Sequence, residues 1–294
     1  MIDPEFPFES RHPSLRERLA ASLPLLAVEL RPPRRALEGV HAMEAWIDVH
    51  HTIRKLSAGG TVVFLTDNAV GSDEEENLTH LVRNLGEDAV RGLVVPFLTL
   101  KHPLRYCESY AARARREGFP ALVVLGGDRH DGIPRCLPHA FELRTRLRAS
   151  QPALLLGGWA NPYRDPVEQL DFLEQQAEGL DFVLTQVMSH HQLAPAQAFV
   201  HHFVRRGLDL PLIGGVFYYR SARRRTLRVL DTFIPVPAEG LTRDFHEHAF
   251  SADEVCAATL RALASLGLTR FYISNLPTAS AAKRLAALRR LAGL

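Results

Sequence analysis

Two acids and an amide in this sequence could together move a proton. Glu29 lies in an apolar run, Asp128 follows two glycines after another such run, and Gln186 lies in a third. An acid in apolar surroundings tends to keep its proton and can donate it, whereas an ionised acid stabilises a cation and an amide orients a polar ring. The set predicts proton transfer to a cationic or nitrogen-rich substrate, provided that the fold brings the three runs together.

Eight short apolar segments must position these side chains, and amphipathic helical segments lie between them. They are residues 25–30, 61–66, 92–100, 121–125, 153–159, 182–188, 210–218 and 271–274. Each is continuously apolar, which is typical of parallel strands covered on both faces. Eight strand–helix units at a spacing of roughly 30 residues predict an α/β fold, a (β/α)8 TIM barrel forming one domain over residues 23–294. A doubly wound open sheet is the alternative, and the lack of a GxGxxG motif after an early strand counts against it.

The ends of the helices are also marked. In residues 251–267, Ser251 stands at the N-cap, Glu254 at the capping-box position and Gly267 at the end. Other expected helix ends carry the glycines Gly59, Gly60, Gly118, Gly179 and Gly207. We expect residues 1–22 to be an N-terminal extension whose short helix covers the bottom or the side of the barrel.

Barrel enzymes carry their chemistry at the carboxyl ends of the strands. Thr66, Gly127, Trp159 and Asn275 stand at these ends, as Glu29, Asp128 and Gln186 do. A glycine such as Gly127 lets a ligand approach the backbone, and Trp159 offers a surface on which a ring can stack. The alternative interpretation is that these residues only cap strands and helices.

Composition excludes several classes of function. Of the 294 residues, 46% are apolar and 23% charged, and a net charge of +2 predicts no nucleic-acid or membrane partner. The three cysteines lie far apart without CxxC spacing, so they predict neither a disulfide framework nor a zinc site. Without a signal-peptide pattern or an apolar run long enough to span a bilayer, the sequence predicts a cytoplasmic protein.

The histidines come in adjacent pairs, among them His50-His51, His190-His191 and His201-His202, and none forms an HExxH motif. Adjacent residues on a helix diverge by about 100°, so both members of a pair cannot face one ion. The sequence therefore predicts no metal site.

Six segments, in this order, resemble the methylenetetrahydrofolate reductase family: VELRPPR, VVPFLTLKHP, LVVLGGD, DFVLTQVMS, DLPLIGGV and GLTRFYISN. The resemblance extends over about residues 25–285. It implies a (β/α)8 barrel that reduces methylenetetrahydrofolate to methyltetrahydrofolate, a step of one-carbon metabolism, with hydride passing from a nicotinamide through FAD to the folate.

The resemblance also implies roles for single residues. Glu29 matches the general acid that protonates the bridging nitrogen of the folate and opens its ring to an iminium cation. Asp128 matches the acid that stabilises this cation, Gln186 the amide that binds the pterin, and Thr66 a threonine beside the flavin. By position, Asn275 is expected at the substrate, and Gly127 and Trp159 at the cofactor.

Several positions depart from the family pattern. Phe97 stands where the family has a histidine, Gly126 where it has an arginine, and Glu174 and Gln175 where a basic pair meets the FAD phosphates. Leu276 replaces the arginine that meets the folate's glutamate tail, and Arg220 or residues 223–225 are candidates to replace that arginine.

The lost cations predict weak or no FAD binding, because charged contacts contribute much of the binding of a phosphate. We therefore expect an oxidoreductase that takes hydride directly from NADH or NADPH. Two alternatives remain open, namely a reductase that keeps FAD and a non-catalytic subunit that binds folate or nucleotide. An oligomer is compatible with either.

Overall fold

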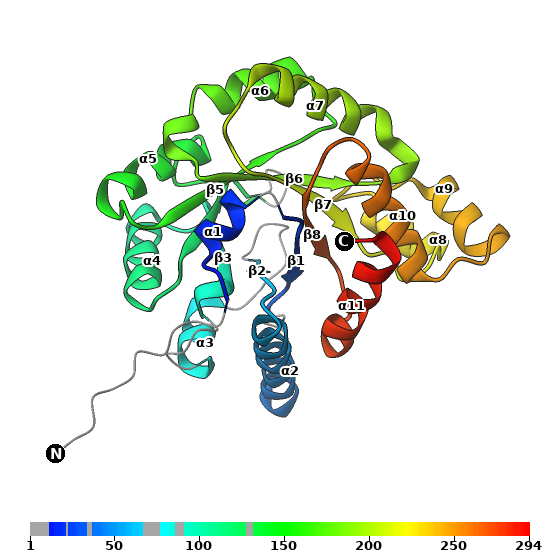
Figure 1. Ribbon diagram of the computed structural model, residues 1–294. Helices are drawn as coiled ribbons and strands as arrows, with labels where there is room; N and C mark the ends of the chain where they lie inside the picture. The colour runs from blue at the N-terminus through cyan, green and yellow to red at the C-terminus, as the bar shows by residue number, and fades with distance from the viewer. Residues whose placement is uncertain (1–11, 22, 34–36, 67–76, 86–90, 128–131) are drawn as a thin grey trace.

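Eight parallel strands close into a barrel in chain order (Figure 1). The computed structural model describes residues 12–21, 23–33, 37–66, 77–85, 91–127 and 132–294. The strands are β1 (Leu25–Leu30), β2 (Val63–Leu65), β3 (Val94–Thr99), β4 (Ala121–Leu125), β5 (Leu155–Ala160), β6 (Phe182–Met188), β7 (Leu212–Phe217) and β8 (Arg270–Ser274). Because β1 pairs with both β2 and β8, the predicted (β/α)8 barrel is confirmed and the open sheet is excluded.

Helices surround the barrel, and the main ones follow the expected pattern (Figure 1). They are α1 (Leu15–Ala20), α2 (Gly39–Ala58), α3 (Asn77–Asn84), α4 (Leu104–Arg116), α5 (Ala140–Ser150), α6 (Pro166–Glu174), α7 (Leu193–Arg206), α8 (Arg224–Leu230), α9 (Ala238–Thr242), α10 (Ala252–Ala264) and α11 (Ala281–Ala292). Short turns add η1 (Arg91–Leu93), η2 (Ala177–Gly179), η3 (His190–Gln192), η4 (Arg243–Glu247) and η5 (Thr278–Ser280). Within the described part of the chain, no helix combines the length and the apolar character needed to cross a bilayer.

The predicted helix ends are mostly confirmed. Ser251 caps α10 with a capping box to Glu254. Gly60, Gly118, Gly207 and Gly267 take positive φ, as expected of residues that end a helix.

Gly179 is the exception among these glycines. It lies in the 3-10 turn η2, because α6 already ends at Glu174 with Gln175 as its C-cap.

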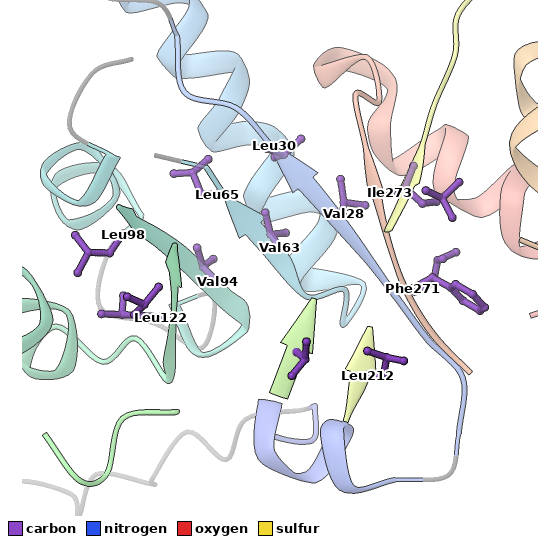
Figure 2. Packing of buried hydrophobic residues seen from close by; sticks show 14 of the residues in the cluster. Val28, Leu30, Val63, Leu65, Val94, Leu98, Leu122, Leu212, Phe271 and Ile273 are labelled. Carbon is purple, nitrogen blue, oxygen red and sulfur yellow. The ribbon is translucent and has the colours of Figure 1, made fainter. Parts of the chain in front are cut away.

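Alternation along each strand sorts the side chains into two cores. On β1, Leu26, Val28 and Leu30 face outward to the helices, and Leu25 and Ala27 face into the barrel. Figure 2 shows part of the outer core along neighbouring strands. The inner core is filled by large rings, those of Phe64, Phe97, Phe182 and Tyr272. With its centre closed by these rings, the barrel offers ligands space only at its ends.

Helix α1 covers the amino-terminal end of the barrel, as one of the two predicted placements had it. Leu15 and Leu19 are buried in the inner core. His12 Nε2 lies 3.0 Å from the Ala58 carbonyl oxygen, and Arg270 at the start of β8 donates to the Ala21 carbonyl. The opposite end, where the strands finish, is the one that carries the predicted site residues.

Candidate active site

Glu29 lies at the carboxyl end of β1 and belongs to the series of residues that face the barrel interior. It is half-buried between the buried residues Val28 and Leu30. The hydroxyl of Ser274, the last residue of β8, donates a hydrogen bond of 2.7 Å to Glu29 Oε1. Glu29 thus lies at the carboxyl end of β1 and is held there by a residue of the neighbouring strand β8.

A pair of main-chain and side-chain contacts fixes Ser274. The Tyr218 N–H donates to the Ser274 carbonyl, and the Asn275 amide donates to the Tyr218 carbonyl at 3.0 Å. Asn275 has a φ of 69°, a left-handed conformation that asparagine tolerates better than most residues. Its amide nitrogen is engaged with the backbone of the neighbouring strand end. Asn275 thus ties the end of β8 to Tyr218, and its contact with a substrate stays a prediction.

Tyr272 lies beside two of the predicted site residues, Glu29 and Trp159. Its ring is fully buried, and its hydroxyl donates to the Thr185 carbonyl at 2.7 Å. Burial raises its pKa well above the usual value, and the neighbouring Glu29 charge raises it further. The Trp159 ring lies 6.3 Å from the Tyr272 ring, at an angle of 52°. Tyr272 thus stays protonated, and its ring lies between Glu29 and Trp159.

Gln186 is set by an irregularity in β6. The register between β6 and β7 shifts between Leu184 and Val187, and a bulge of this kind changes the direction of a side chain. The half-buried Gln186 accepts a hydrogen bond at Oε1 from the Val187 N–H. Thr185 anchors the bulge by accepting from the Gly215 N–H. This arrangement leaves the amide nitrogen of Gln186 as the group suited to a ligand.

Trp159 and two further apolar residues at strand ends keep part of their surface exposed. Trp159 is half-buried and packs against the inner core, as do Leu125 of β4 and Phe217 of β7. The Phe217 ring lies 4.8 Å from that of Tyr219. A partly exposed apolar rim beside a carboxyl group suits a planar ring that carries polar atoms at its edge.

Thr66 is buried next to β1, where its N–H donates to the Leu30 carbonyl. It therefore lies beside the strand end that carries Glu29. Asp128, the predicted second acid, lies outside the described residues.

Two cations approach the glycines at the end of β4. A Cβ atom on Gly126 would lie 2.8 Å from the Arg135 guanidinium carbon, and one on Gly127 would lie 2.6 Å from Lys101 Cε. Arg135 also donates a hydrogen bond to the Gly127 carbonyl, and Gly127 has a φ of +72°. Side chains of the chain itself thus lie against both glycines, and the approach of a ligand to Gly127 stays a prediction.

Arg135 also bears on one departure from the family pattern, Gly126, which stands where the family has an arginine. The positive charge absent at Gly126 is supplied from the loop before α5. Lys101, from the loop after β3, adds a second charge at the same strand end. Sequence reasoning gave neither residue a role: Lys101 lies in the quoted segment VVPFLTLKHP without a matched function, and Arg135 lies in a loop without a motif.

Neither a model of a known protein family nor any curated protein matches this chain. The resemblance to methylenetetrahydrofolate reductase therefore rests on its six sequence segments alone.

The other departures lie in the two cores or at the end of α6. Phe97 is buried in the inner core with its ring 6.1 Å from that of Phe64, and Leu276 is buried in the outer core. The Glu174 carboxylate accepts a hydrogen bond of 2.9 Å from Arg206 on α7. Its negative charge is thus paired with a neighbouring helix. Gln175 is exposed as the C-cap of α6.

Arg220 contacts the residue before Leu276, the position where the family has its tail-binding arginine. Its side chain is exposed, and its guanidinium donates to the Asn275 carbonyl at 3.2 Å. Of the two replacements considered, Arg220 or residues 223–225, the structure brings Arg220 to the end of β8.

The expected divergence of adjacent histidine rings does not hold for His190 and His191. They lie in the 3-10 turn η3, not in an α-helix, and both rings reach Asp244. Burial, followed by the neighbouring His191, lowers the pKa of His190, so its neutral form is favoured.

A hollow of about 330 Å³ lies at the amino-terminal end of the barrel, lined by residues that include Arg16 of α1 and Asp181 before β6. It is a weaker candidate than the strand ends, where an acid, an amide and aromatic rings occur together.

Proposed function

We propose that this protein is an NAD(P)H-dependent oxidoreductase that reduces methylenetetrahydrofolate to methyltetrahydrofolate, with little or no help from FAD. The observation that carries the proposal is the Glu29 carboxyl group, held by Ser274 at 2.7 Å above Tyr272 at the carboxyl end of a closed barrel. The six family-like segments support the choice of substrate.

Glu29 would donate its proton to the bridging nitrogen of the folate, so that the carbon–nitrogen bond breaks and an iminium cation forms. A reduced nicotinamide supplies the hydride, which adds to the iminium carbon and yields the methyl group and the oxidised nicotinamide. Gln186 would bind the pterin edge, Trp159 would stack on a ring, and Asp128 would stabilise the cation. Arg220 is suited to a carboxylate of the glutamate tail.

Lys101 and Arg135 suit a pyrophosphate group, which both FAD and a nicotinamide dinucleotide contain. They favour, as a second candidate, the same reductase with bound FAD. A third candidate, a folate- or nucleotide-binding subunit without turnover, is favoured by the burial of Phe97 and Leu276 at positions where the family has functional side chains.

The decisive experiment measures oxidation of NADH and NADPH that depends on methylenetetrahydrofolate, using flavin-free protein with and without added FAD. Turnover without FAD supports direct hydride transfer, and turnover only with FAD supports the second candidate. Silence in both conditions while folate still binds supports the third.

Glu29→Gln tests the role of the acid, because it keeps the size and removes the proton to be donated. We expect turnover to fall by about 100-fold or more while folate binding is retained. Glu44→Gln, at an exposed position on α2, serves as the control and should leave turnover unchanged. Equal turnover in the two variants would reject Glu29 as the proton donor.

A further inference from the structure

Two histidines from one turn and a buried aspartate from another meet outside the barrel. His190 Nε2 and His191 Nε2 lie 3.1 and 2.9 Å from the same oxygen of Asp244, Oδ2. The Asp244 side chain is 6% exposed, and those of His190 and His191 are 18% and 14% exposed. The cluster joins η3, which follows β6, to η4, which lies between β7 and α10.

The segment that presents Asp244 departs from regular backbone in two ways. Residues Arg243–Glu247 form a π-helical turn, a rare form that occurs frequently at functional sites. Ala249 then takes a φ of 53°, which is unfavourable for a residue with a Cβ atom and persists only where its surroundings hold it. The Phe250 N–H donates to the Asp244 carbonyl and stabilises this turn.

Space for the second ring comes from a glycine on α9. A Cβ atom on Gly240 would collide with the His191 ring. The site thus combines a π turn, a strained alanine and a missing side chain, and all three serve to bring two imidazoles onto one buried carboxylate.

The donor set fits a transition metal. The three ligand atoms lie within 4.8 Å of one another. Zinc binds imidazole nitrogen and carboxylate oxygen at about 2.0–2.1 Å, so two ligands of one ion lie roughly 3 Å apart. The observed separations from Asp244 Oδ2 match this spacing.

The other side of the His190 ring also fits. His190 Nδ1 lies 2.8 Å from Thr259 Oγ1 on α10. When Nδ1 donates to this hydroxyl, Nε2 carries a lone pair toward Asp244. A hydrogen bond on the far nitrogen is the usual way in which a protein orients a metal-binding histidine. His248 Nδ1 lies 3.6 Å from the other oxygen, Oδ1, of Asp244, and its exposed side chain would have to turn to supply a fourth ligand.

We propose that His190, His191 and Asp244 bind a divalent metal ion of the zinc class, which ties the end of β6 to the long connection between β7 and α10. The role is structural, and it does not depend on the proposed reductase activity. The ion would fix the turn that follows Gln186 by four residues and the segment that carries α8 and α9.

Binding of Zn²⁺ to tag-free, chelator-treated protein tests the proposal, with calorimetry for affinity and Co²⁺ absorption for the ligand set. We expect one ion per chain and a rise of about 5 °C in the midpoint of thermal unfolding at saturating metal. Asp244→Asn should weaken binding more than about 100-fold and abolish the thermal shift.

The matched control uses the other histidine pair. His201 and His202 lie on α7 with their rings at 87° to each other, so His202→Gln should leave both affinity and thermal shift unchanged. If Asp244→Asn fails to fold, His191→Gln takes its place, because its ring is the second ligand and lies nearer the surface than Asp244. No saturable Zn²⁺ binding to the wild type, or equal binding by the wild type and the folded ligand variant, would overturn the proposal.

Discussion

The Thr185 carbonyl and the Tyr272 hydroxyl, which meet inside the barrel, connect the core to the candidate site. Tyr272 donates to this carbonyl, and Thr185 in turn holds the bulge that carries Gln186. The contact is buried on both sides, so its loss leaves a polar atom without water. A single hydroxyl group therefore supports both the stability of the barrel and the placement of the amide.

Tyr272→Phe is expected to lower the free energy of unfolding by about 1–3 kcal/mol, because the Thr185 carbonyl stays buried without its donor. Tyr163→Phe is the matched control. The Tyr163 hydroxyl is buried and has no hydrogen-bond partner among the described residues, so its removal should leave stability unchanged or slightly higher. Urea unfolding of both variants measures the difference. Equal changes in unfolding free energy in the two variants would show that the Tyr272 hydrogen bond adds nothing to stability.

At this scale the sequence predicts types of residue better than contacts. Glu29, Trp159 and Gln186 are found because each stands at or near the end of an apolar run. Tyr272, the neighbour of Glu29 and Trp159, and the donor Ser274 come from the far end of the chain. The predicted barrel puts β8 beside β1, but it does not show which side chains meet there. The meeting of His190 and His191 at Asp244 is missed because the sequence argument assumes an α-helix where the chain makes a 3-10 turn.

Loops at the carboxyl ends of the strands supply positive charges that the strands themselves lack. The segment after β3 contributes Lys101 and the segment before α5 contributes Arg135, and both side chains reach the Gly126-Gly127 turn of β4. Two cations at one strand end attract an anionic group, and the glycines allow them to come close to the backbone.

Arg135→Gln is expected to raise the KM for the nicotinamide dinucleotide about 10-fold with little change in kcat, because it removes a charge-assisted contact and leaves Glu29 in place. Steady-state kinetics on purified protein give both constants. Lys283→Gln on α11 is the control for the loss of a positive charge. A fall in kcat with an unchanged KM would place Arg135 near the reacting atoms instead.

Helix α1 belongs to the same unit as the barrel in its packing. Leu15→Ala is expected to cost about 3 kcal/mol of unfolding free energy, since its side chain is 1% exposed in the inner core. Leu23→Ala removes the same atoms from a residue that is 75% exposed, and we expect a change below about 0.5 kcal/mol. Chemical unfolding compares the two. Similar small effects would mean that α1 is only loosely attached.

The regular elements follow from local pattern, and the long connection after β7 does not. β1, β4 and β6 have the predicted bounds because buried parallel strands are continuously apolar. Between β7 and α10 the chain forms α8, α9 and a π turn, and no hydrophobic periodicity in the sequence predicts them. Their conformation depends on contacts with η3 and α10, which only the folded chain provides.

The folded chain shields several tyrosines from water, Tyr272 inside the barrel and the others outside it. Burial raises the pKa of Tyr163 to about 12, and it also raises the pKa of Tyr218, Tyr219 and Tyr272. The unfolded chain loses these protons near pH 10, as ordinary tyrosine does. The folded chain therefore binds more protons above that pH than the unfolded chain.

Each of these tyrosines contributes stability that is complete below about pH 10 and is lost as the pH rises through the folded pKa. We expect the midpoint of thermal unfolding to fall between about pH 10 and pH 12, with tyrosinate absorbance appearing together with unfolding. Near-ultraviolet absorbance and circular dichroism, recorded on the same samples, test this. Ionisation of these tyrosines in a chain that keeps its native circular dichroism would contradict it.

Closure of the barrel also determines when the candidate site can exist. Glu29 and the Ser274 hydroxyl that holds it are separated by 245 residues, and the two meet only because β1 pairs with β8, the last strand of the sequence. Contacts between such distant parts of a chain form slowly. During synthesis, Glu29 leaves the ribosome long before Ser274. A chain that stops before β8 therefore contains the proposed proton donor without the hydroxyl group that orients it.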